Sequence, residues 1–202
     1  MLHPDTELRY VDETIGFGVF ARKRIPKGTI TWALDELDRH FTEEEVSALD
    51  DLRRNYFLKY SYRDQRGLYI LCWDYGKYMN HSFDANCVGT AYELELAARD
   101  IEAGEQLTSD YGTLNVDEPF DCLPEEGSSR LRVMPDDLLR YAETWDRLAA
   151  DAFARFNEVE QPLKHLMKPE FARKIEGITT RGEPLDSIAS FYYAGRRERE
   201  TS

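Results

Sequence analysis

Residues 77–87 read KYMNHSFDANC, and residues 98–112 read ARDIEAGEQLTSDYG. The first stretch is polar and irregular, which predicts that it belongs to a loop at residues 74–86. The second stretch predicts a turn at residues 102–105, which contains a glycine, followed by a short strand at residues 106–111. Because a loop of this length in a compact domain usually has a function, these two stretches direct the interpretation of the rest of the chain.

A third stretch, GFGVFA at residues 16–21, fits the dinucleotide-binding pattern G-x-G-x-x-A. In nicotinamide enzymes this glycine turn leads into a helix whose N-terminus faces the pyrophosphate. Here residues 22–28 are a basic turn that contains Pro26, so no such helix is expected. The context argues against a nicotinamide enzyme, and a glycine-rich hairpin is the alternative interpretation.

The rest of the N-terminal half predicts one helix among short strands. Thr42-Glu43-Glu44-Glu45 is a capping box, so we expect a helix from there to about Tyr56. Strands are expected at residues 8–11, 19–22, 29–34, 56–62, 67–73, 87–91 and 94–99.

The character of the sequence changes near Pro135. Proline followed by two aspartates is a strong helix start, and apolar residues at helical spacing predict a long amphipathic helix over residues 135–158. A second helix is expected from Pro169 and a third over residues 186–193. The charged tail at residues 196–202 is expected to fray.

The three quoted stretches, together with the turn at residues 25–28, resemble the motifs of the SET-domain protein-lysine methyltransferase family in the family order. Residues 77–87 are similar to R-F-I-N-H-S-C-x-P-N, and residues 98–112 to A-x-R-D-I-x-x-G-E-E-L-T-x-D-Y. The resemblance spans about residues 8–112 and is closest to the small bacterial or viral type. It implies a mainly β fold, the SET-domain β-clip of small curved sheets with a knot-like crossing, followed by an α-helical C-terminal extension. We expect a SET domain at residues 1–133, with a degenerate post-SET segment at about 113–133, and the extension at residues 134–202.

The resemblance also implies a binding site for S-adenosyl-L-methionine, which is converted to S-adenosyl-L-homocysteine. The backbone of Phe17 and Gly18 should contact the methionine end, Asn80 the amino-acid or ribose part, and the backbone of His81 the adenine edge. The His81 imidazole is expected to hold the chain crossing. Phe120 stacks on the adenine or makes a plain core contact. The full set of expected cofactor-binding residues is Gly16, Phe17, Gly18, Tyr78, Asn80, His81 and Phe120.

Tyr111 is the expected catalytic residue, with a buried core tyrosine as the alternative. Methyl transfer requires a neutral amine, and deprotonating a free lysine at pH 7 costs about 4.6 kcal/mol. An apolar channel and a nearby cationic sulfonium both disfavour the ammonium form, and the Tyr111 hydroxyl can then orient the amine. Ser109 and Tyr111 are the expected substrate-channel residues. Because Ser109 stands where many family members carry Phe or Tyr, we expect room for di- or trimethyl-lysine.

No metal is expected. The three cysteines, Cys72, Cys87 and Cys122, contain no CxxC pair, and only Cys122 lies where some relatives have a zinc-binding post-SET segment, whereas zinc needs four ligands. The N-terminus lacks the features of a signal peptide and no apolar run approaches about 18 residues. We therefore expect free thiols and a cytoplasmic protein, or a nuclear one if the source is eukaryotic, without membrane association.

Lys and Arg total 26 against 39 for Asp and Glu, a formal net charge of −13. Such a surface disfavours direct nucleic-acid binding and favours cationic partners, although many proteins are acidic merely for solvation. We expect an active methyltransferase for lysines of a basic protein: histone-like, DNA-associated or ribosomal. The alternative is a non-catalytic SET-fold module that binds a basic partner. A small-molecule or nucleic-acid methyltransferase is disfavoured because the alternating strand–helix pattern of those enzymes is absent.

The helical extension has two candidate roles. It closes the lysine channel, with Trp145, Tyr192 and Tyr193 as wall residues, or its apolar stripe packs on the β-core or pairs two subunits in a homodimer.

Overall fold

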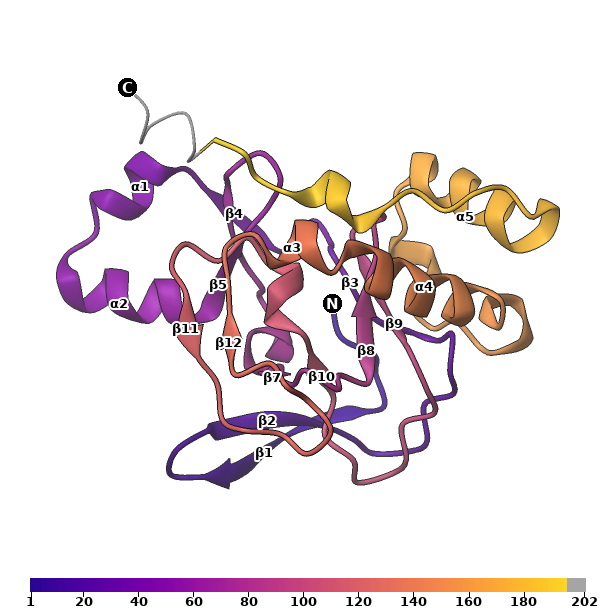
Figure 1. Cartoon of the computed structure of the whole chain (residues 1–202), viewed down its shortest axis with the longest axis horizontal. Coiled ribbons are helices and arrows are strands. Elements are labelled where there is room, and N and C mark those ends of the chain that lie inside the picture. The colour runs from indigo at the N-terminus through magenta and orange to yellow at the C-terminus, as the bar shows by residue number, and fades with distance from the viewer. Residues whose placement is uncertain (196–202) are drawn as a thin grey trace.

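The computed structural model describes residues 1–195, and the predicted tail at 196–202 lies outside them. Several small sheets form the centre of the molecule, with helices α1 and α2 on one side and α4 and α5 on the other (Figure 1). The content is mixed, 31% helix and 23% strand. The small sheets and C-terminal helices were predicted correctly, but "mainly β" was wrong, because most strands have only two to four residues.

Within residues 1–195 the strands form four sheets, and the largest carries the two motif-bearing strands at one edge. Its order is β3-β9-β8-β10-β7, and β10 runs parallel to both β7 and β8. The knot-like crossing stays a prediction; the structure shows β10 inserted between two strands that precede it in the chain. The strands of this sheet are β3 Ile30–Ala33, β7 Asn80–His81, β8 Cys87–Gly89, β9 Leu94–Ala97 and β10 Thr108–Ser109.

The three smaller sheets are antiparallel. They are the hairpin of β1 Thr6–Asp12 with β2 Gly16–Ala21, the sheet of β4 Arg39–Phe41, β5 Ser61–Arg63 and β6 Tyr69–Leu71, and the hairpin of β11 Phe120–Asp121 with β12 Arg132–Val133. Gly16 adopts a φ of +82° at the first hairpin turn, which favours glycine.

The predicted helix from Thr42 to Tyr56 is two helices, and the predicted strand at residues 56–62 is wrong. The Thr42 capping box starts α1 as expected, but α1 (Glu43–Ser47) ends after five residues. Asp50 then accepts a hydrogen bond from the Arg53 N–H at 2.9 Å and starts α2 (Asp51–Tyr60), so strand β5 begins only at Ser61.

The predicted helix at 135–158 is also interrupted. It consists of α3 (Asp137–Arg140), α4 (Ala142–Phe153) and a 3-10 turn, η3 (Phe156–Glu158), because Tyr141 leaves the helical conformation with ψ near 6°. The Tyr141 ring packs on the Arg130 guanidinium 4.2 Å away, which accompanies this break. The helix from Pro169 is confirmed as α5 (Pro169–Arg181), preceded by η4 (Lys164–Leu166), and the third predicted helix is only a 3-10 turn, η5 (Ile188–Phe191).

One hydrophobic core joins the large sheet to the C-terminal helices. Leu94 and Leu96 of β9 share it with Trp145 and Phe153 of α4. A second, smaller core beneath β2 contains Val19 and Leu107, together with residues of β8 and β9. The helices after residue 134 therefore pack directly on the sheet that holds the motif strands.

Candidate active site

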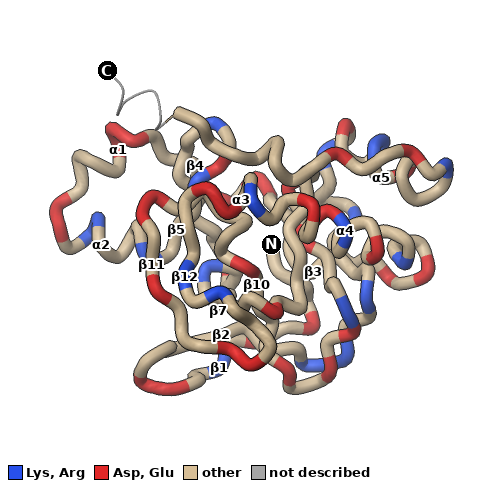
Figure 2. The backbone as a smooth tube through the Cα atoms, in the orientation of Figure 1, with Lys and Arg blue, Asp and Glu red and all other residues tan. Residues whose placement is uncertain are grey.

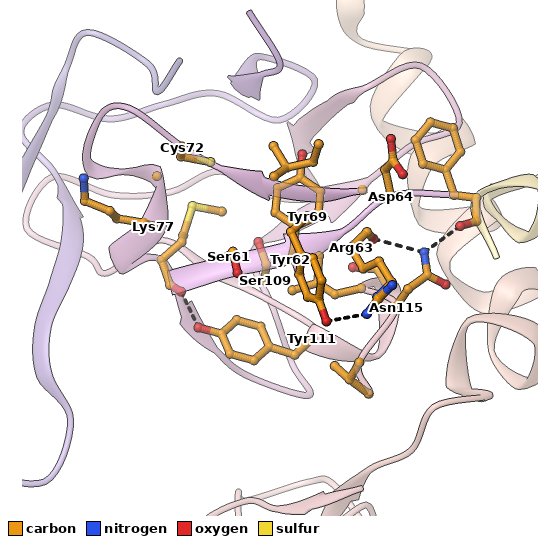
Figure 3. Close-up of a pocket in the computed structure, with 18 of the residues that line it drawn as sticks. Ser61, Tyr62, Arg63, Asp64, Tyr69, Cys72, Lys77, Ser109, Tyr111 and Asn115 are labelled. Atoms are coloured by element: carbon orange, nitrogen blue, oxygen red, sulfur yellow. Dashed lines mark hydrogen bonds between the residues drawn. The ribbon is translucent and has the colours of Figure 1, made fainter. Parts of the chain in front are cut away.

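Residues from the five-stranded and the three-stranded sheet line a cavity of about 780 Å³ (Figure 3). Tyr62 comes from β5, Glu95 from β9 and Ser109 from β10. Tyr111 follows directly in the 3-10 turn η2 (Tyr111–Thr113), and Met79 follows the 3-10 turn η1 (Tyr75–Tyr78). The cavity thus lies where the two stretches singled out in the sequence meet.

Tyr111 is held at the wall of this cavity by two hydrogen bonds. Its hydroxyl donates to the carbonyl oxygen of Met79 at 2.6 Å, as Figure 3 shows, and its backbone N–H donates to His81 Nδ1 at 3.1 Å. Asp110 starts the turn by accepting from the Gly112 N–H at 2.9 Å. Burial raises the pKa of the Tyr111 phenol to about 12, so the hydroxyl is neutral and keeps its proton at physiological pH.

His81 links the two motif strands. It pairs with Ser109 across the parallel ladder of β7 and β10. Because Nδ1 accepts a backbone N–H, the proton of the neutral ring is on Nε2, and burial lowers the pKa of His81 and favours this neutral form. Within residues 1–195 the buried Nε2 has no hydrogen-bond partner. The Phe83 ring packs edge-on against the imidazole, with centroids 4.3 Å apart.

The expected cofactor-binding residues of the first hairpin and of β7 lie together. The Asn80 amide donates to the carbonyl oxygen of Phe17 at 3.1 Å. A Cβ on Gly18 would lie 2.9 Å from Asn80 Nδ2 and 2.7 Å from Gln106 Nε2, so this position requires glycine as long as those side chains stay where they are. Phe17 is 46% exposed, and its ring centroid lies 6.0 Å from that of Tyr78.

Phe120 joins the same neighbourhood from the hairpin β11–β12. Its ring centroid lies 6.2 Å from that of Tyr111 and 6.4 Å from that of His81. The segment after β11 is fastened to the loop that follows β7, since one Glu125 carboxylate oxygen accepts from the Ser82 hydroxyl at 2.9 Å and the Phe83 N–H at 2.8 Å.

A buried ion-pair network fastens the other side of this hairpin. The Arg130 guanidinium pairs with Asp110 directly before Tyr111, and with Asp137 of α3 at 2.8 Å. It also packs over the Phe83 ring at 4.3 Å. Protein contacts from both sides therefore hold this hairpin in place.

Glu95 is a cavity residue that the sequence interpretation missed. The Ser109 hydroxyl lies 3.0 and 2.9 Å from its two carboxylate oxygens. Burial raises the pKa of Glu95 to about 7, although the hydrogen bond from Ser109 acts in the opposite direction. In the sequence LELA, alternation places Glu95 opposite Leu94 and Leu96, which is typical of a solvent-facing strand position. Here the opposite face is a cavity.

The C-terminal segment reaches the cavity through residues other than those expected. Ile188 and Phe191 line it, whereas Trp145 is buried in the main core. Asn115 holds the segment in place by donating to the carbonyl oxygen of Phe191 at 2.8 Å and accepting from the Tyr193 N–H at 2.8 Å. The extension thus both packs on the sheet and contributes to the cavity wall, and its functional role stays a prediction.

No group of three or more His, Cys, Asp or Glu side chains in residues 1–195 is arranged to hold a metal ion. Cys72 and Cys87 are buried and Cys122 is partly exposed, and all three are free thiols. Among the same residues, no helix combines the length and apolar character that crossing a bilayer requires.

Comparison with known proteins places the two motif stretches in one family. Residues 16–112 match the family model of the SET domain. Among solved structures, the chain is similar to a Plasmodium falciparum protein described as a putative histone methyltransferase, at 18% identity and a TM-score of 0.40, over 55% of this chain and 95% of that one. No curated protein matches significantly. From the match over residues 16–112 we conclude that the chain belongs to the SET-domain family, a membership that implies a protein-lysine methyltransferase.

Proposed function

We propose that this protein transfers methyl groups from S-adenosyl-L-methionine to lysine side chains of a basic protein. The observation that carries the proposal is the position of Tyr111. Its neutral phenol lies on the wall of the cavity, while its backbone bonds to His81 in the same strand as Asn80. A substrate in the cavity and a cofactor at Asn80 would therefore meet at this tyrosine.

The residues around Asn80 fit the cofactor. Gly18 packs directly against the Asn80 and Gln106 side chains, and the exposed Phe17 ring offers an aromatic surface. The Nε2–H of His81 is a buried donor without a partner in the described chain. We assign the binding of the cofactor to Phe17, Gly18, Tyr78, Asn80, His81 and Phe120. When bound, S-adenosyl-L-methionine supplies an electrophilic methyl group on a cationic sulfur.

Tyr111 orients the reacting amine in this proposal. A phenol with a pKa of about 12 keeps its proton, which is directed to the Met79 carbonyl, and its oxygen lone pairs remain available as acceptors. An amine N–H that donates to this oxygen has its lone pair directed elsewhere, which fixes the direction of attack. No proton needs to leave Tyr111 for this role.

The charge of the cavity supports a cationic substrate. Arg63 is neutralised by Glu43 at 2.6 Å and by Asp117 at 3.2 Å, so its charge is balanced within the wall. Acidic residues also recur throughout the described part of the chain (Figure 2), consistent with the net charge of −13. These charges favour association with a lysine-rich protein or tail, and not with nucleic acid. The acidic lining residues are Glu43, Asp64, Glu93, Glu95, Asp117 and Glu118, against the basic Lys59, Arg63 and Lys77.

The test is incubation with methyl-labelled S-adenosyl-L-methionine and a set of basic proteins, followed by mass spectrometry of labelled lysines. Tyr111→Phe is the matched variant. We expect it to lower turnover by about two orders of magnitude or more, with cofactor affinity nearly unchanged, because the hydroxyl acts mainly in the transition state. Unaltered turnover in Tyr111→Phe would remove the tyrosine from the mechanism, and the absence of any labelled lysine would contradict the proposed function.

A further inference from the structure

Glu95 is a half-buried carboxylate with few hydrogen-bond donors. Leu94 and Leu96 on either side of it enter the main core, whereas Glu95 lines the cavity. Within residues 1–195 the Ser109 hydroxyl is the single hydrogen-bond donor to this carboxylate, and no cation forms an ion pair with it. One hydroxyl supplies one proton for a group with about four acceptor sites. A carboxylate in such surroundings is costly unless a further donor or a cation joins it.

Ser109 makes room for this carboxylate and connects it to the catalytic segment. Ser109 is buried, and its side chain is small enough for both Glu95 oxygens to approach within 3.0 Å. It lies two residues before Tyr111, whose side chain lines the same cavity. Glu95 and Tyr111 face the same cavity, where burial first and the negative charge of Glu95 second raise the pKa of the Tyr111 phenol.

We propose that Glu95 binds the ammonium group of the incoming side chain in this cavity and accepts its proton before the methyl group is transferred. An N–H bond of the ammonium breaks, its electron pair stays on nitrogen as the lone pair that attacks, and the proton bonds to a carboxylate oxygen of Glu95. The positive and negative charges are thereby neutralised together, which a buried cavity favours over an ion pair. This inference rests on the proposed function, because it assumes that the substrate is an amine.

The groups facing Glu95 leave it as the acid that titrates near neutrality. Those that interact with its charge are the phenols of Tyr62 and Tyr111 and the thiols of Cys72 and Cys87. Burial raises the pKa of all four, so they are neutral around pH 7. With a pKa of about 7, Glu95 is partly ionised at physiological pH, and its carboxylate can still accept a proton from a bound ammonium group.

The first test does not depend on turnover. Calorimetric titration of the full chain with n-butylammonium chloride, a probe that mimics the end of a lysine side chain, is expected to show binding that weakens at least about tenfold in Glu95→Gln. Glu36→Gln removes the same charge from an exposed position that does not line the cavity and is expected to change the affinity less than about twofold. Glu95→Asp keeps the acid, and an intermediate affinity is expected; it also serves if Glu95→Gln does not fold. Equal affinity in the wild type, Glu95→Gln and Glu95→Asp, or no binding to the wild type, would overturn the inference.

The second test is the pH profile of kcat/KM, measured with a protein or peptide that the wild type has been found to methylate. The wild type is expected to gain activity as the pH rises to about 7, and Glu95→Gln to lose this limb and at least about tenfold in rate at neutral pH. Tyr111-dependent methylation with an unchanged profile in Glu95→Gln would refute the role of Glu95 while leaving the function intact. Glu95-dependent probe binding in a protein that methylates no substrate would instead contradict the proposed function and the proton transfer, leaving only the ammonium site.

Discussion

At the scale of single residues, Gly18 lies where the first hairpin packs against Asn80 of β7. In Gly18→Ala, the new Cβ would displace the end of the Asn80 side chain and disturb its hydrogen bond to the Phe17 carbonyl. The obstructed atoms are flexible amide ends, so the fold should survive. We expect the affinity for S-adenosyl-L-methionine to fall about tenfold, measured by calorimetry, with a change in unfolding free energy of no more than about 1 kcal/mol. Wild-type affinity in this variant would separate Gly18 from the cofactor site.

The ionisation of Glu95 is expected to make the stability of the fold depend on pH. Its pKa is raised from 4.5 to about 7 in the folded protein, so the folded state holds this proton more tightly than the unfolded state. The resulting stabilisation is complete below about pH 4.5 and is lost as the pH rises through 7. Between pH 5.5 and pH 8, the melting temperature of the wild type should therefore fall relative to that of Glu95→Gln.

Thermal unfolding at both pH values measures this difference. Comparing the two proteins cancels the contributions of buried His3 and His81, whose pKa values are lowered and whose effect has the opposite sign. Glu36→Gln should keep the wild-type pH dependence. Parallel pH dependence in the wild type and Glu95→Gln would mean that Glu95 is ionised as readily in the folded chain as in the unfolded one.

The sequence was a good guide to residues whose neighbours form a motif. Asn80, His81 and Tyr111 were selected from local stretches, and the structure brings them together. Glu95 and Tyr62 could not be selected, because strand alternation shows which face a residue occupies but not what covers that face. That face becomes a cavity wall because Tyr62 of β5 and Glu95 of β9 line the same space.

At the scale of elements, helix starts were easier to predict than helix ends. The Thr42 capping box and Pro169 both start helices where expected. The expected continuation past Ser47 failed, because Asp50 caps a new helix and because Leu52 and Tyr56 of α2 are 69% and 63% exposed, so no core contact supported the apolar spacing. Tertiary contacts of this kind cannot be read from a local pattern.

Glu125 ties the hairpin β11–β12 to the loop after β7, and this tether is expected to support cofactor binding. In Glu125→Ala the loop after β7 loses the carboxylate that accepts from Ser82 and Phe83. The hairpin should loosen and Phe120 should lose its position beside His81 and Tyr111. We expect cofactor affinity to fall about fivefold, with a small change in melting temperature, and calorimetry measures it.

Glu126→Ala is the control for Glu125→Ala, since the neighbouring glutamate is exposed. It should bind the cofactor like the wild type. If both variants bind it equally well, the tether has no part in the cofactor site.

At the scale of the whole molecule, the core does not divide at residue 134. Leu94 and Leu96 of β9 pack with Trp145 and Phe153 of α4. A chain that stops at residue 133 should therefore lack a cooperative thermal transition, because the apolar face of the central sheet is exposed. Circular dichroism during heating checks this expectation, and a cooperative melt of the fragment would show that the first 133 residues fold independently. The homodimer through the C-terminal helices stays a prediction.

The placement of β10 also has a consequence for biosynthesis. β7 and β8 are synthesised before β10, and no backbone hydrogen bonds link them into one sheet until residues 108–109 insert between them. While the ribosome is still adding the residues before this point, both strands keep open backbone edges that can pair with other chains. The nascent protein is therefore most vulnerable to aggregation until the segment bearing Tyr111 emerges from the exit tunnel, so the residues that lead into the proposed catalytic tyrosine also close the gap between β7 and β8.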